Sequence, residues 1–398
     1  MNKTKKIWQV NAELNKIIES FTVGEDYILD KKLLPYDIKA SLAHIKMLYK
    51  GNILSEKEFS DLQKGLNEIL KLWRNGGFQI TQDQEDGHTA IEQFLTEKYS
   101  EAGAKIHTGR SRNDQVLIMM RLFMLDEIKE ISVLFDKLET ALRNQSKKNS
   151  ELKLPGYTHA QKAMVASISM WLESFADGIL DQKPFLKAMN KLLDQSPLGS
   201  AAGFGIRNFK NNRKLTAKIM GLSKVQENPM YCGLSRGHFE NQFLQSISPT
   251  MLLLSRLNSD LLLFTMSEFN FMKLPVNMTT GSSIMPQKRN YDVLEIVRGR
   301  INAFLSSQLE IQNLIRNLIS GYNRDLQLTK KSFVIAVENA KEILEIMILV
   351  IKNLEFNKDK LNNAMTADLF ITEKVYELVN KGVPFRDAYQ KIKKEFLK

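Results

Sequence analysis

The sequence predicts an all-α protein with a central bundle of about five long helices per subunit and smaller helical domains at the N- and C-terminal ends. Three observations support this fold class. The 398 residues include only 20 glycines and 9 prolines, so turns should be few and elements long. Apolar side chains recur every three or four residues over unusually long stretches. Apolar residues make up 43% and charged residues 25%, the balance of a globular protein.

The first 106 residues alternate shorter helical patterns with loops such as Asn75–Gly77, which predicts a smaller N-terminal helical domain over residues 1–106. The N-terminal stretch lacks the apolar core of a secretion signal. No run of about 18 uncharged apolar residues occurs in the chain. Secretion and membrane spanning are therefore both disfavoured.

Five helical patterns fill residues 107–355, the predicted central bundle domain. In the first, apolar positions alternate with charged ones over about 35 residues, as expected of one long bundle helix. Pro184 and Pro249 each remove a backbone donor and should bend or break their helices. Residues 356–398 are short and polar and predict a small C-terminal helical domain. The five patterns run from Leu117 to Leu142, Met164 to Leu193, Phe243 to Met266, about Asp292 to Asn317, and Phe333 to Leu354.

These helices exceed the usual 11 to 12 residues, and several are apolar around more than half of their circumference. Such helices need neighbours on several sides, which predicts an obligate oligomer. The alternative is a large monomeric bundle.

The net charge of +11 would permit nucleic-acid binding, but the basic residues are scattered and no nucleic-acid motif accompanies them. A solvated basic surface is therefore the favoured interpretation. The single cysteine, Cys232, excludes an internal disulfide and a zinc site of several thiolates. A reducing cytoplasm is the natural compartment.

Three irregular segments between the helical patterns concentrate reactive side chains. The first, HTGRSRNDQ at 107–115, precedes the longest pattern. Ser111, Asn113 or Asp114 can cap that helix, and Arg110 and Arg112 with free backbone donors can bind a carboxylate. Capping alone is the alternative.

The second segment, PGYTHAQ at 155–161, reads as a turn entering a helix, where His159 is either a general acid or base or the cap. The third, GSSIMPQKRN at 281–290, is a polar loop in which Lys288 places a positive charge near two hydroxyls. Such a loop can close over a substrate. A plain surface turn is the alternative, although it would leave Ile284 and Met285 exposed.

Together these segments resemble the signatures of the fumarase/aspartase superfamily, and the first two are similar to argininosuccinate lyases in particular. The third alone identifies only the superfamily. The resemblance spans nearly the whole chain. Further matching stretches are FTVGEDYILD at 21–30, SLAH at 41–44, EDGHTAIE at 85–92, SPLGSAAG at 196–203, GYNRDLQLTK at 321–330 and GVPFRDAY at 382–389.

The resemblance implies a fumarase/aspartase-like fold and a cytoplasmic homotetramer whose active sites are each assembled from three subunits. It implies a carbon–nitrogen lyase of the amidine-lyase type that cleaves argininosuccinate reversibly to fumarate and L-arginine in arginine biosynthesis, without metal or organic cofactor. Shared sites also agree with helix length, because a helix of about 35 residues spans roughly 50 Å and separates the segments at its ends.

The resemblance also implies residue roles. Ser282 matches the base that removes the Cβ proton, Lys288 and Asn290 match groups that stabilise the aci-carboxylate, and His159 with Glu295 matches the pair that serves the departing nitrogen. A proton beside a carboxylate is weakly acidic, so fixed positive charge must meet the intermediate. The matching substrate-binding positions are Ser111, Arg112, Asn113, Thr158, Asp86, His88, Tyr322, Gln327 and Lys330.

Three departures from the family pattern are Tyr291 in place of Pro, Gly24 in place of Ser, and Ser235-Arg-Gly-His238 in place of Ser-Asp-Arg-Asp. The last makes Arg236 a candidate for binding the substrate's arginine part. Two other functions compete. Adenylosuccinate lyase or another succinyl-lyase is disfavoured by HTGRSRNDQ, and an inactive structural protein, such as a lens crystallin, has no need of the four catalytic candidates.

Overall fold

The computed structural model describes residues 15–396; the N-terminal segment considered for a secretion signal lies almost entirely outside them. The described residues form sixteen α-helices and eight strands of two to seven residues, and the strands pair only two by two. The all-α prediction is therefore confirmed. Within the described part, no helix is both long and apolar enough to span a membrane.

The chain packs into two compact units, each built from three separate stretches of sequence. Unit 1 comprises residues 1–130, 185–246 and 305–337, and unit 2 comprises residues 131–184, 247–304 and 338–398. The division of the chain at residues 106 and 355 into three domains stays a prediction.

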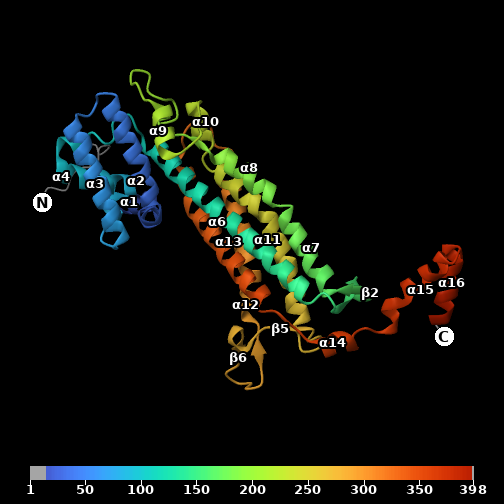
Figure 1. The fold of residues 1–398 in the computed structure, drawn as a ribbon. Helices are drawn as coiled ribbons and strands as arrows, with labels where there is room; N and C mark the ends of the chain where they lie inside the picture. The colour runs from blue at the N-terminus through green and yellow to red at the C-terminus, as the bar shows by residue number, and fades with distance from the viewer. Residues whose placement is uncertain (1–14, 397–398) are drawn as a thin grey trace. The chain divides into compact units, whose positions relative to one another are not determined.

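Five helices open unit 1, and α2 (Asp26–Lys50), α3 (Glu56–Arg74) and α4 (Gly87–Tyr99) pack around one apolar core (Figure 1). Ser55 starts α3 with a capping box, in which its hydroxyl accepts from Glu58 N and the Glu58 carboxylate accepts from Ser55 N. Leu34, Leu62 and Leu95 are among the fully buried core side chains. The remaining elements here are α1 (Lys16–Val23), η1 (Gln82–Gln84) and α5 (Glu101–Ala104).

The later stretches of unit 1 pack on the first part of the longest helix. Arg121 of that helix is fully buried, donates to Gln195 O at 2.7 Å and lies over the ring of Phe239 at 4.3 Å. These contacts offset part of the cost of burying the guanidinium, whose Nε has no hydrogen-bond partner among the described residues. The elements are α8 (Lys183–Leu193), β3 (Gln195–Ser196), α9 (Arg213–Met220), β4 (Lys224–Val225), α10 (Pro229–Leu234) and η3 (Arg324–Gln327), with β3 and β4 parallel.

Four of the five predicted long helices form as single helices, and each contributes residues to both units. Their buried positions follow the predicted apolar seams; Met120, Phe135 and Leu142 are examples on the first. Pro249 does not end its helix. The four are α6 (Arg112–Lys148), α11 (His238–Phe264), α12 (Asp292–Leu314) and α13 (Thr329–Lys352).

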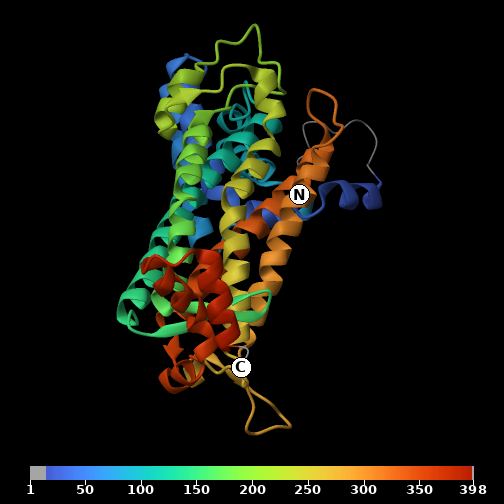
Figure 2. The same ribbon diagram turned by 90° about the vertical axis from the view of Figure 1, so that its right-hand side faces the viewer.

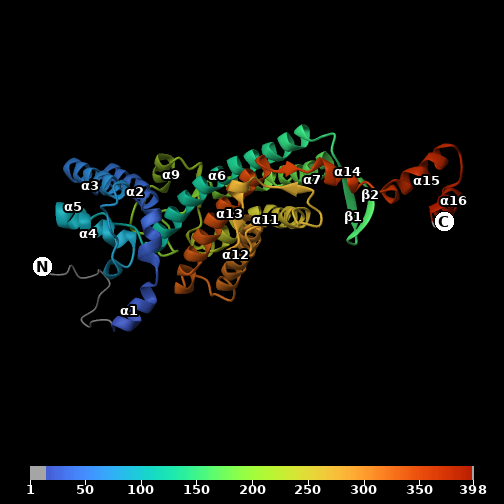
Figure 3. The same ribbon diagram turned by 90° about the horizontal axis from the view of Figure 1, so that it is seen from below.

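The predicted helical pattern from Met164 to Leu193 is wrong at its start, whereas the expected interruption near Pro184 is found. Its first residues belong to β2 (Gln161–Ser167), which pairs with β1 (Lys153–Thr158) in an antiparallel hairpin visible in Figure 3. Ser167 then caps α7 (Ile168–Leu180), and α8 begins at Lys183, so the expected interruption lies at residues 181–182, just before Pro184. A short apolar run cannot be assigned to strand or helix from its pattern alone, which explains the error.

The rest of unit 2 consists of short pairs of strands and three small C-terminal helices. Val375, Ala388 and Ile392 form a separate small core between the last two helices. The elements are β5 (Met272–Lys273) with β8 (Glu355–Phe356), η2 (Val276–Met278), β6 (Thr280–Gly281) with β7 (Arg289–Asn290), α14 (Lys358–Asn363), η4 (Ala367–Phe370), α15 (Ile371–Asn380) and α16 (Phe385–Phe396).

Candidate active site

Unit 1 brings together Asp86 and Arg112, two candidates from separate motifs. Asp86 is the N-cap of α4, and its Oδ1 accepts from Thr89 N at 2.8 Å and from Thr89 Oγ1 at 2.9 Å. Arg112 Nη1 lies 2.8 Å from Glu85 Oε2 and 3.5 Å from Asp86 Oδ2. Burial acts against ionisation, but the positive charges of His88 and Arg112 lower the pKa of Asp86. A charged, preorganised cluster results.

His88 forms a buried pair with Asp37 of α2. Its Nδ1 lies 2.6 Å from Asp37 Oδ2, and both side chains are almost fully buried. Burial opposes protonation, but the Asp37 carboxylate raises the pKa of His88. The other ring nitrogen, Nε2, has no hydrogen-bond partner among the described residues. A protonated His88 would therefore carry one unused donor.

The start of α6 holds three candidates, and capping explains part of their arrangement. Ser111 Oγ accepts from Asn113 N at 3.3 Å, and Asp114 Oδ1 accepts from Ser111 N at 2.8 Å. Asp114 Oδ2 also accepts from Gly199 N and Ala201 N, which ties the 196–203 loop to this helix. Burial raises the pKa of Asp114 to about 6. Ser111 and Asn113 themselves remain partly exposed.

Arg110 is not available for carboxylate binding as the sequence suggested. Its side chain is buried and donates to Ser41 Oγ at 3.0 Å and to Ile106 O at 2.8 Å. A guanidinium that already bonds two internal acceptors serves to hold the loop before α6. Of the two arginines in this motif, only Arg112 reaches the cluster around Asp86.

Lys330 is not an exposed helix lysine. Its side chain is only 2% exposed, and Nζ lies 2.7 Å from Asp30 Oδ1 and 3.2 Å from Asp26 Oδ2. Burial opposes the charge, but these two carboxylates raise the pKa of Lys330. Asp30 Oδ2 also accepts from Gly87 N at 2.9 Å, so the lysine is linked to the start of α4.

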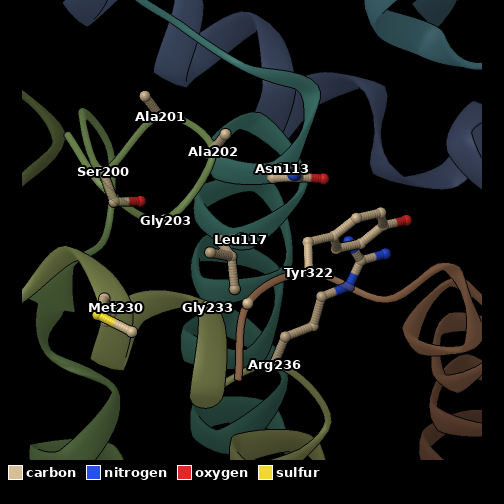
Figure 4. Close-up of a pocket in the computed structure, with 11 residues that line it drawn as sticks. Asn113, Leu117, Ser200, Ala201, Ala202, Gly203, Met230, Gly233, Arg236 and Tyr322 are labelled. Carbon is tan, nitrogen blue, oxygen red and sulfur yellow. The ribbon is translucent and has the colours of Figure 1, made fainter. Parts of the chain in front are cut away.

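Two more candidates, Gln327 and Tyr322, lie near the end of α1 and near α10 respectively. Gln327 Nε2 donates to Thr22 O at 3.2 Å and to Val23 O at 3.1 Å. Tyr322 faces a pocket and has Arg236 Cζ 5.2 Å from its ring centroid. The pocket is small, with a cavity volume of about 20 Å³, and Asn113 also lines it (Figure 4). Unit 1 thus gathers polar groups from four separate motifs.

The hairpin of unit 2 carries Thr158 and His159 at its tip. Thr158 pairs with Gln161, so the turn consists of His159 and Ala160, with φ of 53° and 59°. Such two-residue turns favour Asn-Gly, because other residues pay a steric cost at positive φ. The prediction that this segment enters a helix is wrong.

The 281–290 loop lies between β6 and β7, just before α12 (Figure 2). Ser282 Oγ accepts from Met285 N at 3.1 Å and from Ile284 N at 3.3 Å. Asn290 Nδ2 donates to Gly281 O at 3.4 Å, which closes the loop. Ile284 is 86% and Met285 41% exposed, the exposure that the alternative of a plain surface turn would give.

Lys288 and Glu295 complete the candidates of unit 2, and both are exposed. Neither forms an ion pair within residues 15–396. Glu295 lies in the first turn of α12. The structure thus places Ser282, Lys288, Asn290 and Glu295 on one loop and the helix that follows it, and places Thr158 and His159 on the hairpin.

None of the candidates named from the sequence lies on α2, yet Asp26, Asp30 and Asp37 of that helix contact Lys330 and His88. The first two are four residues apart and the third follows seven residues later, so all three share one helix face. The sequence feature that could have identified them is the spacing of these aspartates on one face of an otherwise apolar helix. No group of three metal-ligating side chains occurs in the described part of the chain.

Comparison with known proteins gives consistent matches. A family model described as "Lyase" matches residues 9–303. The argininosuccinate lyase of Thermotoga neapolitana is 42% identical over 393 residues, which cover 99% of this chain and 98% of the relative. That of Bacteroides fragilis is 37% identical over 388 residues, covering 98% and 87%. That of Xanthomonas campestris pv. campestris is 39% identical, covering 97% and 90%.

Solved structures match the fold. An EDDS lyase in complex with formate aligns with a TM-score of 0.80 and 22% identity, covering 96% of this chain and 76% of that one. A class II fumarase from Schistosoma mansoni aligns with a TM-score of 0.77 and 16% identity, covering 94% and 91%. At these identities the likeness concerns the architecture of long helices alone.

Proposed function

The chain belongs to the argininosuccinate lyase family, and we propose that it catalyses the reversible β-elimination of argininosuccinate to fumarate and L-arginine. The observation that carries this proposal is the 42% identity to an argininosuccinate lyase over nearly the full length of both chains. The motifs at 107–115, 155–161 and 281–290 supply the polar side chains that this reaction needs.

Ser282 is the proposed base. It removes the proton from the carbon next to the carboxylate, and the carbon–nitrogen bond then breaks as the double bond of fumarate forms. Two backbone N–H groups point at Ser282 Oγ, which favours its anionic form because hydrogen bonds to a charged group stabilise it.

Lys288 and Asn290 stabilise the intermediate in this proposal. Removal of the proton places extra negative charge on the carboxylate, and a fixed cation lowers the energy of that state. Lys288 has no ion pair among the described residues, so its charge is free to meet substrate. Asn290 closes the loop through Gly281 and keeps its amide near Ser282.

His159 with Glu295 serves the departing nitrogen. The guanidino nitrogen is a poor leaving group as an anion. A general acid must therefore supply or orient a proton for it as the carbon–nitrogen bond breaks. The exposed place of His159 at the tip of the β1–β2 hairpin supports its role, because an exposed imidazole at a turn can reach a bound substrate.

The proposed binding groups are polar side chains of the family motifs. Ser111, Arg112, Asn113 and Thr158 suit the succinyl carboxylates, because they offer hydroxyl, guanidinium and amide donors. Lys330 directs two of its three donors at Asp26 and Asp30 and keeps one for substrate. The other proposed contacts are Asp86, His88, Tyr322 and Gln327.

A homotetramer with active sites shared between subunits completes the proposal. Leu252, Leu309 and Leu349 are large apolar side chains that are exposed on three different long helices. Exposed apolar residues on several long helices are typical of faces that pack against another chain. We place the enzyme in the cytoplasm and in arginine biosynthesis.

One experiment separates this function from its alternatives. Fumarate formation is followed with argininosuccinate, adenylosuccinate, malate and aspartate in parallel, at equal enzyme and substrate concentrations. The proposal expects cleavage of argininosuccinate to be fastest by a wide margin. Faster cleavage of adenylosuccinate would indicate a different succinyl-lyase, and no fumarate from any substrate would indicate a structural protein.

A further inference from the structure

The β1–β2 hairpin that carries His159 needs outside support to hold its tip. The two strands form a sheet of their own, and a lone pair of strands is only marginally stable in water. Their register shifts between Pro155 and Tyr157, where an irregularity interrupts the pairing. Beyond it, the tip keeps two residue pairs, between residues 157–158 and 161–162. Contacts with other elements of unit 2 must therefore fix the tip.

Lys162 connects this tip to the C-terminal part of unit 2. Its Nζ donates to Ala364 O and to Thr366 Oγ1, both at 3.0 Å. Ala364 is the C-cap of α14 and Thr366 is the N-cap of η4, so one ammonium bridges two consecutive elements. A hydrogen bond from Thr366 and the charge of Lys162 lower the pKa of Asp368, which continues this chain of polar groups. The tip is thereby tied to residues 364–368.

Tyr157 supports the same face of the tip. It pairs directly with Lys162, and paired residues of antiparallel strands place their side chains on one face. The Tyr157 ring packs against Phe269, with ring centroids 6.2 Å apart. Farther from the tip, Lys153 Nζ lies 5.5 Å from the ring centroid of Phe370, and β1 packs against α14 (Figure 3). Lys162 thus supplies a polar anchor of the tip and Tyr157 an apolar one.

A fixed tip matters for the proposed role of His159. This residue is exposed, so the backbone of the turn, and not packing of the ring, sets where the imidazole stands. A displacement of a catalytic group by about 1 Å can lower a rate by about a hundredfold. Lys162 follows His159 by three residues, close enough for its anchor to hold the turn.

We propose that Lys162 is a positioning residue, which holds the hairpin tip through Ala364 and Thr366 so that His159 can reach the departing nitrogen. This inference rests on the proposed function. The segment at residues 364–370 then contributes to turnover by supporting the hairpin. Lys162 itself takes no part in proton transfer.

The test combines kinetics with hydrogen exchange. Wild type, Lys162→Met and Lys162→Arg are compared in the cleavage of argininosuccinate, and exchange of the backbone amides of residues 157–162 is followed by mass spectrometry. We expect Lys162→Met to lower kcat by roughly ten- to a hundredfold, with KM within about twofold of the wild type. Exchange of these amides should become about fivefold faster. Lys162→Arg should recover most of the turnover, because a guanidinium can also donate to two acceptors.

Two further variants separate positioning from other roles. Thr366→Val removes one acceptor and keeps the lysine charge, so it should lower kcat with unchanged KM, by a smaller factor than Lys162→Met. Lys374→Met, at an exposed position of α15, is the control for loss of a lysine and should change neither kcat nor exchange at the tip. The melting temperature should hardly move in any variant, because these side chains are at the surface. If Lys162→Met does not fold, Thr366→Val decides the test.

Three results would overturn the inference. A raised KM with unchanged kcat in Lys162→Met would make Lys162 a substrate-binding group. Wild-type kinetics in Thr366→Val beside a slow Lys162→Met would show that the lysine acts through its charge alone. Unchanged kcat in Lys162→Met would make it an ordinary solvated lysine. Absence of cleavage by the wild type refutes the proposed function instead, and the exchange rates then still report whether Lys162 holds the hairpin.

Discussion

The candidates of the two units differ in how their charges are held. In unit 1, Lys330 and His88 are buried and bonded to carboxylates of α2, at 2.7 Å and 2.6 Å. In unit 2, Lys288 and His159 are exposed, and neither side chain has a hydrogen bond or ion pair with another described residue. The same residue types are therefore fixed in one unit and free in the other.

This difference separates two tasks. Groups that recognise a substrate gain from being held in place beforehand, because their ordering then costs nothing at binding. Groups that move a proton must reach the reacting atoms, and exposed loops can do so once a surface covers them. We therefore expect substitutions in unit 1 to affect folding and binding together, and substitutions in the unit 2 segments to affect turnover with little effect on stability.

The largest expected effect is that of Ser282→Ala on turnover. Loss of a base in a covered site typically lowers the rate by several orders of magnitude. The unfolding free energy should change by less than about 0.5 kcal/mol, because this side chain is on a surface loop. Steady-state kinetics and chemical denaturation of the same preparation measure both quantities.

Ser283→Ala is the matched control, since Ser283 is the exposed neighbour of Ser282 in the same loop. Its turnover should stay within a fewfold of the wild type. A near-normal rate in Ser282→Ala, or a collapse in Ser283→Ala alone, would show that the base has been assigned to the wrong residue.

Lys330→Met should cost stability in unit 1. The substitution leaves Asp30 buried without its cation, and breaking a buried pair costs about 3 to 5 kcal/mol. Argininosuccinate binding should weaken as well, by about 1.5 to 3 kcal/mol if one charged hydrogen bond to substrate is lost. Denaturation with urea and the apparent KM measure the two effects.

Lys331→Met is the control for this prediction. Lys331 is exposed and pairs with exposed Glu25 at 2.6 Å, so its loss should cost at most about 1 kcal/mol. Equal unfolding free energies of Lys330→Met and Lys331→Met would show that the buried Lys330–Asp30 pair contributes no more to stability than an exposed pair.

The long helices were predictable because apolar period and sparse turn residues act locally along the chain. The hairpin at 153–167 was not, since β2 merges without a break into the apolar pattern of α7. The His88–Asp37 pair could not be predicted from the sequence either, because the two residues lie 51 positions apart and only tertiary packing brings them together. Arg110 was predicted to bind a carboxylate but is buried, because its position near Arg112 in the sequence carries no information about burial.

A smaller effect concerns pH and His107, which precedes α6. Burial and the Arg110 charge lower the pKa of His107 to about 4. Between about pH 6.5 and 4 the unfolded chain therefore binds a proton that the folded chain does not, so this residue makes stability fall as pH falls.

His107→Gln should remove that contribution. The stability difference between wild type and variant should change by about 1 to 2 kcal/mol across this range, after allowance for partial exposure. Denaturation curves at pH 7, 5.5 and 4.5 measure it. The raised pKa of Asp114 acts in the opposite direction, but it is common to both proteins and cancels in the difference. A constant difference at all three pH values would contradict a lowered pKa.

The most direct test of this account is complementation between two inactive variants. The account holds that each active site takes His159 from one subunit and Ser282 from another. His159→Asn and Ser282→Ala then remove residues that different subunits contribute to the same site. After mixed refolding at equal amounts, about a quarter of the sites should hold both wild-type residues and recover activity. Subunit exchange is verified with differently tagged chains. Verified mixed oligomers without activity would contradict the shared site.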